Sequence, residues 1–150
     1  MEKLGKKKKK EILKGLEEYG INIKENLIYL TKDSVYLLTP EAFELIKRIK
    51  KEGIKFRAGF YLAKIEKQGL RLSFDSCQLF SKQIKKYIEI NREEAEKWFK
   101  GEEINISNKQ EGFFVLKYKE DFVGCGFVKN GIIKNYIPKD RRIKSFKNEC

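Results

Sequence analysis

The last third of the sequence contains three apolar runs that are separated only by short turns. They read GFFVLKY, FVGCGFVK and IIKNYI, and the turn between the last two is Asn130-Gly131. Asn-Gly between alternating apolar runs is the strongest short-range signal for a two-residue β-hairpin. The sequence therefore predicts an antiparallel meander, which constrains how the rest of the chain can pack.

The final run of this meander alternates in a way that gives its two faces different characters. Successive side chains point to opposite faces of a strand, which groups Ile133, Asn135 and Ile137 against Ile132, Lys134 and Tyr136. The first group contains two good core residues. In the second group, Lys134 stands beside Tyr136, and this pair suits contact with a phosphate and stacking on a base.

Basic residues follow the meander directly. Pro138 ends the predicted strand, and Lys139, Arg141 and Arg142 come next. Arginine can bond a phosphate or a guanine edge through two parallel hydrogen bonds, which lysine cannot do. Two alternatives stay open at this point: Tyr136 as a half-buried sheet residue, and the two arginines as part of a solvated tail.

Upstream of the meander, helical and strand patterns alternate. Helices are predicted after the Lys run up to Gly20, from Pro40 to Gly53, from Ser73 to Phe80 and from Asn91 to Gly101. Strands are predicted at LIYL, VYLLT, FYLAKIEK, GLRLS and KKYIEI. The helix ends carry their own signals: Thr39 before Pro40, Ser73 as an N-cap, Asn91 with Glu94 as a capping box, and Gly101 as a left-handed C-cap.

The domain boundary is predicted near residues 81–84. It divides the chain into an N-terminal α/β domain (1–82) and a second domain (83–150). Residues 1–10 are rich in lysine, and we expect them to form a flexible tail.

The formal net charge of +12 lies almost entirely at the two ends of the chain. Residues 1–10 hold six Lys and one Glu, and residues 129–147 hold seven Lys or Arg and one Asp. A field concentrated in this way attracts polyanions and speeds their encounter with the protein. The alternative is that a lysine-rich surface only keeps the protein in solution.

Several classes of chemistry are excluded by composition. The chain has no His and three Cys without CxxC spacing, which excludes Ser-His-Asp and Cys-His catalysis and argues against a zinc site. No GxGxxG or Walker A run is present. Cys125 reads as a small buried residue in a strand whose two glycines mark a bulge, a close backbone approach or a tight corner, of which we favour the corner. We therefore expect no catalytic residue, no metal and no cofactor.

Neither a leader peptide nor a membrane span is expected. The basic residues 6–10 are followed by an amphipathic, acidic stretch rather than by an apolar one, and no long apolar run occurs elsewhere. The cysteine pattern argues against a disulfide framework. We expect a cytoplasmic protein without a membrane partner.

The segment GFFVLKYKEDFVGCGFVKNGIIKNYIPKDRRI resembles the end of PUA domains attached to 5-methylcytosine RNA methyltransferases of the nucleolar-protein/Sun family. The matching positions are Gly124 and Gly126, Lys134-Asn135, Pro138-Lys139 and Arg142, with Gly101 in the upstream WFKGEEI. This resemblance covers residues 98–142. Further upstream, FRAGFYLAKIEKQGLRLSFDSCQLF resembles more weakly the region that precedes this domain in those enzymes and in small ribosome-biogenesis PUA proteins.

The resemblance implies an α+β fold in which an N-terminal α/β, pre-PUA-like region precedes a PUA-like mixed β pseudo-barrel with short helices. It also implies binding of structured RNA. The family's catalytic Pro-Cys motif has no counterpart here, because no Cys of this chain follows a Pro. The expected protein is an RNA-binding module and not an enzyme.

The predicted RNA contacts combine the resemblance with the alternation of the last strand. They are Lys134, Asn135, Tyr136, Lys139, Arg141, Arg142 and, beside Ala58-Gly59, Arg57. The expected partner is rRNA or tRNA, with a role in rRNA processing, tRNA modification or ribosome biogenesis, and a separately encoded RNA methyltransferase is a further candidate. Two other hypotheses stay open: a non-catalytic subunit that docks on a methyltransferase or a ribosomal protein, and an unrecognised enzyme.

Overall fold

The computed structural model describes residues 6–53, 59–107 and 109–143. The helices of these residues are α1 (Lys6–Tyr19), α2 (Pro40–Lys51), α3 (Phe74–Leu79) and α4 (Arg92–Phe99), with short 3₁₀ turns η1 (Glu25–Leu27) and η2 (Lys139–Arg141). The strands are β1 (Ile28–Thr31), β2 (Ser34–Leu37), β3 (Phe60–Glu66), β4 (Gly69–Leu72), β5 (Tyr87–Glu89), β6 (Ile104–Asn105), β7 (Gly112–Tyr118), β8 (Asp121–Lys129) and β9 (Ile132–Lys134).

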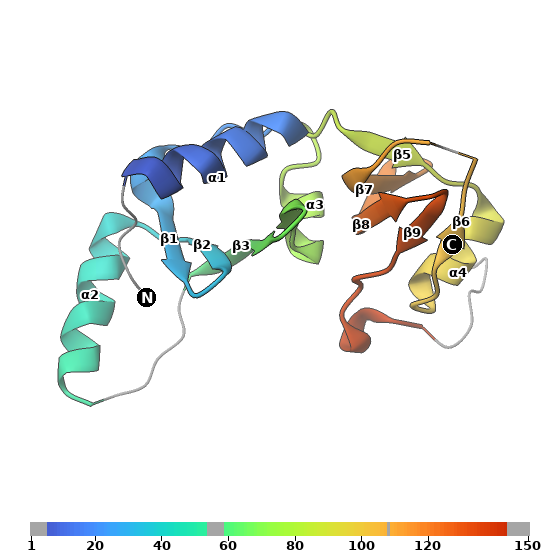
Figure 1. Cartoon of the computed structure of the whole chain (residues 1–150). Coiled ribbons are helices and arrows are strands. Elements are labelled where there is room, and N and C mark those ends of the chain that lie inside the picture. The colour runs from blue at the N-terminus through green and yellow to red at the C-terminus, as the bar shows by residue number, and fades with distance from the viewer. Residues whose placement is uncertain (1–5, 54–58, 108, 144–150) are drawn as a thin grey trace.

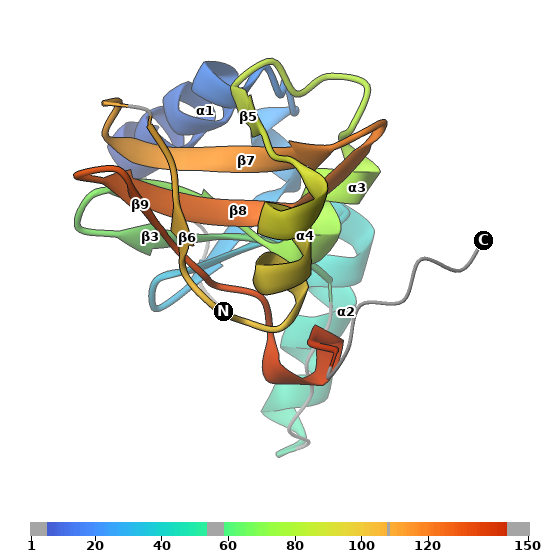
Figure 2. The same ribbon diagram turned by 90° about the vertical axis from the view of Figure 1, so that its right-hand side faces the viewer.

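These strands form two sheets (Figure 1). Sheet A has the order β1-β2-β3-β4, and each neighbouring pair is antiparallel. Sheet B has the order β5-β7-β8-β9-β6, and β5 runs parallel to β7 while the other pairs are antiparallel. Sheet B curls into a half-barrel with α4 beside it (Figure 2). The predicted α+β class, with a mixed β pseudo-barrel after an N-terminal α/β region, is confirmed.

The predicted meander is present as β7, β8 and β9. Its second turn has positive φ angles at both central residues, 54° at Asn130 and 75° at Gly131. This is the type I′ geometry that Asn-Gly favours and that matches the twist of the flanking strands. The turn fixes the register of the hairpin, in which Val128 pairs with Ile133.

The helix ends follow the signals in the sequence. The Thr39 hydroxyl accepts a hydrogen bond from the Ala42 N–H at 3.1 Å, and α2 begins at Pro40. Asn91 and Glu94 form a complete capping box at the start of α4. Each cap satisfies backbone N–H groups that a helix leaves without a partner in its first turn.

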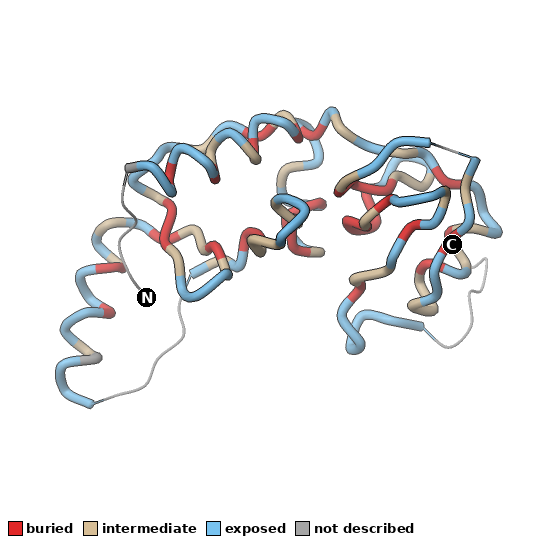
Figure 3. Tube along the Cα trace, in the orientation of Figure 1, coloured by how far each residue is buried: buried red, intermediate tan, exposed pale blue. Residues whose placement is uncertain are grey.

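One hydrophobic core is shared by α1 and both sheets. Ile12, Leu16 and Tyr19 form the buried stripe of α1, and they belong to the same cluster as Leu72 of sheet A and Val115 of sheet B. Figure 3 shows the buried positions on the sides of α1 and α3 that face the sheets. The predicted boundary between residues 82 and 83 stays a prediction, because the two halves of the chain meet in this cluster.

A second core surrounds Trp98, and it explains the two glycines of β8. The Trp98 indole is fully buried and donates a hydrogen bond to the Val123 carbonyl at 2.6 Å. A Cβ at Gly124 would lie 3.2 Å from the indole, and one at Gly126 would lie 3.0 Å from it and 2.5 Å from Ile133 Cγ2. The glycines therefore allow close approach of a side chain from α4, which is a more specific reason than the tight corner that we favoured.

The N-terminal lysines differ from the expected flexible tail. Lys6–Tyr19 form α1, so the helix already includes the lysines from Lys6 onward, while residues 1–5 lie outside the described part of the chain. Lysine is a good helix former, and Lys9 lies on the same face as Ile12 and Leu16, where it is buried. Its long aliphatic stem can cover apolar surface beside the stripe.

Of the helices in the described residues, none combines the length and the apolar character that a membrane crossing requires.

Candidate nucleic-acid interface

The chain leaves β9 through residues 134–142, which we call the basic exit. Ile133 and Ile137 are buried, while Ile132, Lys134 and all residues of η2 are exposed. The predicted division into a core face and a solvent face is found for Ile132, Ile133, Lys134 and Ile137, whereas Tyr136, predicted on the solvent face, is half-buried. Figure 3 shows η2 exposed along its whole length, at the lower edge of the molecule.

Asn135 holds the basic exit in place through three hydrogen bonds to backbone groups. Its Nδ2 donates to the carbonyl oxygens of Trp98 at 2.7 Å and Glu102 at 2.9 Å. Its Oδ1 accepts from the Ile137 N–H at 2.8 Å. The side chain thus joins the end of α4 to the strand exit, and its amide is already occupied by protein partners.

Tyr136 packs between the two sheets. The Arg71 guanidinium carbon lies 4.3 Å from the centre of the Tyr136 ring, and Lys134 Nζ lies 5.5 Å from it. Arg71 in turn donates to Glu66 Oε1 at 3.2 Å. Part of the ring is therefore covered by a cation from sheet A, and Tyr136 is half-buried as the alternative interpretation expected.

Arg141 lies on η2 and is partly neutralised by α3. Its guanidinium pairs with the Asp75 carboxylate at 3.2 Å and lies 5.6 Å from the centre of the Phe74 ring. The side chains of Arg141 and Asp75 remain 45% and 50% exposed. An ion pair as exposed as this is weak, so an incoming phosphate can replace the carboxylate.

Arg142 forms a hydrogen bond with the backbone of the exit. Its Nε donates to the Ile137 carbonyl at 3.0 Å. The side chain lies across Gly101, where a Cβ would meet the guanidinium at 2.6 Å, and Gly101 has a φ of +89°. Gly101 therefore both ends α4 in the left-handed conformation, as predicted, and leaves room for Arg142.

Lys134 and Lys139 are the cations of the exit that are most available. Both are exposed, and neither forms an ion pair with another residue in the part of the chain that the structure describes. The exit also carries Arg141 and Arg142 against the single carboxylate of Asp140. The arrangement gives a positive surface on one side of the half-barrel. Arg57, the remaining predicted contact, lies outside the described residues.

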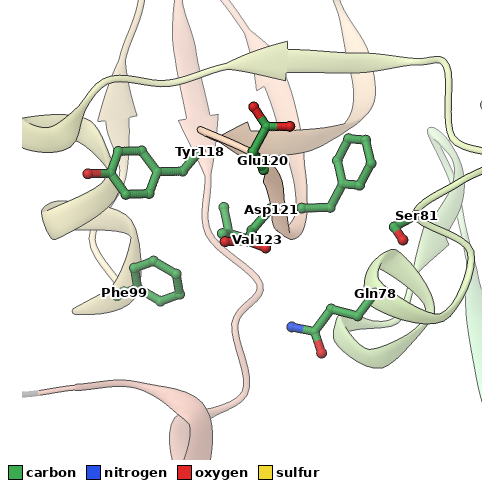
Figure 4. A pocket seen from close by; sticks show the side chains of 8 residues that line it. Gln78, Ser81, Phe99, Tyr118, Glu120, Asp121 and Val123 are labelled. Carbon is green, nitrogen blue, oxygen red and sulfur yellow. The ribbon is translucent and has the colours of Figure 1, made fainter. Parts of the chain in front are cut away.

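A separate pocket of about 440 Å³ lies between α3, the end of α4 and the β7–β8 turn (Figure 4). It is lined by Gln78, Ser81, Phe99, Tyr118, Glu120, Asp121, Phe122 and Val123. Of the described residues, two carboxylates and no basic side chain line it, so its charge disfavours a phosphate. The positive surface of the exit and this pocket are chemically distinct.

Two of the three thiols are buried in the shared core. Burial raises the pKa of Cys77 well above its ordinary value, and the neighbouring Cys125 raises it further. Burial also raises the pKa of Cys125, although a hydrogen bond with Tyr19 acts in the opposite direction. Thiols with raised pKa values are mostly protonated at neutral pH, and a protonated thiol is a poor nucleophile.

Residues 85–143 match the family model of the methyltransferase RsmF PUA domain. This segment is similar to a PUA domain. The segment contains sheet B, α4 and the whole basic exit. The match confirms the predicted resemblance to PUA domains of RNA methyltransferases. A search of the curated proteins found no match to the chain.

A PUA domain is an RNA-binding module, so the match supports RNA binding as the general function of this segment. Sequence reasoning found the residues of the exit from their alternation and charge. It did not find Arg71 and Asp75, which lie outside the PUA domain and reach the exit only in the folded structure. No local pattern marks either of them as a neighbour of the exit.

Proposed function

We propose that this protein is a stand-alone RNA-binding module that binds structured RNA, either rRNA or tRNA, and assists RNA modification or ribosome biogenesis. The observation that carries the proposal is the exposed set of cations on the PUA domain's exit. In this proposal Lys134, Lys139 and Arg141 contact phosphates, while Asn135 and Arg142 hold the exit in position.

The charges of the exit suit a nucleic acid better than a small ligand. Its cations are spread along an exposed surface instead of lining a closed cavity, and a phosphate backbone offers negative charge at regular intervals. Arg141 adds a planar guanidinium that can bond a phosphate bidentately once it leaves Asp75. A separately encoded RNA methyltransferase is a natural partner in this proposal, because the PUA domain resembles those of such enzymes.

The proposal is tested by measuring binding to total tRNA and to rRNA fragments over a range of salt concentrations. The variant is Lys134→Ala/Lys139→Ala, and the matched control is Lys14→Ala/Lys24→Ala, which removes two other exposed charges, on α1 and just after it. Each lost phosphate contact should reduce the slope of log affinity against log salt by about 0.7 to 0.9.

We expect the exit variant to bind more weakly and with a smaller salt slope, while the control keeps most of both. Absence of binding to either RNA at low salt would overturn the proposal. Equal losses in the exit variant and the control would mean that net charge alone, and not this surface, attracts RNA.

A further inference from the structure

Among the residues that the structure describes, one face of sheet A carries aromatic and basic side chains that no helix covers beyond the β1 end. Cross-strand partners in an antiparallel sheet point to the same side, and here Tyr36 pairs with Tyr61 and Lys64 pairs with Arg71. Ser34 shows that the two pairs lie on the same side of the sheet, because it pairs with Lys64 and lies two residues before Tyr36. We call the set of Tyr36, Tyr61, Lys64 and Arg71 the tyrosine face.

The tyrosine face is opposite the core. The other side of the sheet carries Val35, Ala63 and Leu72, which are buried in the cluster shared with α1. Figure 1 shows α1 on one side of sheet A, with α2 and η2 on the other side at opposite ends of the sheet. The tyrosine face therefore lies between α2 and the basic exit.

Helix α2 covers only the β1 end of this side of the sheet. Tyr29 of β1 stacks on Phe43 of α2 with ring centres 4.2 Å apart, and Tyr29 is buried. Tyr61, two strands away, is 37% exposed. A binding partner that packs on this ring would remove its aromatic surface from water.

The two rings of the face are arranged so that neither covers the other. The centres of Tyr36 and Tyr61 are 5.6 Å apart and their planes are tilted by 46°. Burial raises the pKa of Tyr61, although Arg71 acts in the opposite direction. The phenol is therefore neutral at physiological pH and presents no negative charge to a phosphate.

The face is continuous with the basic exit. Arg71 lies over the ring of Tyr136, at 4.3 Å from its centre, and Lys134 lies near the same ring. The cations Lys64, Arg71 and Lys134 therefore follow one another from sheet A to the PUA domain, with Glu66 as the carboxylate paired to Arg71. Alternating rings and cations of this kind are what single-stranded RNA binds, through stacked bases and neighbouring phosphates.

From this arrangement we propose that the tyrosine face binds a single-stranded segment of RNA next to the structured part held by the basic exit. Bases stack on Tyr61 and Tyr36, and Lys64 contacts the phosphates between them, while Arg71, 15% exposed, stays paired with Glu66. The inference rests on the proposed function, because it extends the same RNA from the PUA domain onto sheet A. Residues 34–72 lie outside the segment that matches the PUA family model.

The test uses two probes, oligouridylate as a single strand and a blunt RNA hairpin as a duplex. The variant Tyr36→Leu/Tyr61→Leu removes both rings, and Tyr36→Phe/Tyr61→Phe keeps them. Tyr87→Leu is the control, since Tyr87 is 38% exposed and packs on Phe122, away from this face. Emission of Trp98, the single tryptophan, reports whether each variant is folded.

We expect the Leu variant to lose about tenfold or more in affinity for oligouridylate and to keep its affinity for the hairpin, because stacking serves every base and needs no duplex. The Phe variant and Tyr87→Leu should bind both probes as the wild type does. Unchanged binding of oligouridylate by a folded Leu variant overturns the inference. If the wild type binds the hairpin but not oligouridylate, the inference is also overturned, whereas the proposed function is retained. Failure of the wild type to bind either probe or natural RNA overturns both.

Photo-crosslinking of the wild type gives an independent answer if the Leu variant does not fold. Oligouridylate substituted with bromouridine should crosslink to the peptide that carries Tyr61. Crosslinks confined to other peptides, such as the one that carries Tyr87, would overturn the inference.

Discussion

Replacing Asn135 with Ala should destabilise the protein substantially, although the side chain lies at the surface end of a strand. The change removes three hydrogen bonds at 2.7 to 2.9 Å. The bonds to the Trp98 carbonyl and the Ile137 N–H are partly buried, whereas water can replace the bond to the exposed Glu102 carbonyl. Two partly buried bonds, each worth about 1 kcal/mol, with the cost of leaving their partners unsatisfied, give a loss of about 2 to 3 kcal/mol.

Urea unfolding followed through Trp98 fluorescence measures this loss directly. Trp98 is fully buried and accepts one of the three bonds at its carbonyl, so its emission reports on the same region. The slope of the free energy of unfolding against urea should stay the same while the midpoint falls by about 1 M or more. Asn105→Ala is the matched control, since Asn105 is exposed on β6, and it should change the stability by less than about 0.5 kcal/mol.

A loss below about 0.5 kcal/mol in Asn135→Ala would refute the reasoning. It would mean that water satisfies the freed groups and that the basic exit is held by other contacts. Asn135→Asp gives a further check. The carboxylate still accepts from the Ile137 N–H but faces two carbonyl oxygens, so this variant should be no more stable than the Ala variant.

Two further predictions concern the cores. Gly126→Ala should cost about 1 to 3 kcal/mol of stability, because the new methyl group meets Ile133 and Trp98, and a thermal melt at or above the wild-type midpoint would contradict this. Stability should also fall in alkali, because buried Cys77 and Tyr19 have raised pKa values and keep protons that the unfolded chain loses. The loss should begin near the ordinary thiol pKa of 9.0 and approach about 1.4 kcal/mol per pH unit for each group. Urea midpoints measured across the alkaline range give this loss of stability. The variant Cys77→Ala should lose less stability per pH unit. The same loss per pH unit in that variant and in the wild type would show that Cys77 does not contribute.

Much of the fold could be predicted because its signals are local. The turn at Asn130-Gly131, the caps at Thr39 and Asn91, and the glycine at position 101 each act on a few neighbouring residues, and each is found as predicted. Alternation likewise separated Ile133 from Lys134 correctly, because the period of a strand is a property of the backbone.

What could not be predicted depends on residues far apart in the chain. No turn signal in the sequence predicts the parallel pairing of β5 with β7 or the pairing of the short β6 with β9, because these strands are not joined by a tight turn. Asn135 was predicted as an RNA contact because the pair Lys134-Asn135 matches the ending of the PUA domains that the segment resembles. Its two carbonyl partners belong to α4 and the following loop, and only the fold brings them within reach.

The position of Arg71 beside Tyr136 is of the same kind. These residues are separated by most of the second half of the sequence; Arg71 lies in β4 of sheet A, whereas Tyr136 follows β9 of sheet B. A periodicity argument can say which face of β4 Arg71 occupies. It cannot say that Arg71 meets the exit of β9, because that depends on how the half-barrel packs on sheet A.

The core shared by α1 and sheet B has a consequence for synthesis on the ribosome. Helix α1 is made before either sheet, yet Leu16 and Tyr19 belong to a cluster that also contains Val115 and Cys125. Until Cys125 has left the exit tunnel, the apolar stripe of α1 lacks part of its native packing. Through most of translation the nascent chain therefore presents a basic, amphipathic helix whose apolar side is incompletely covered, the kind of surface that a chaperone binds.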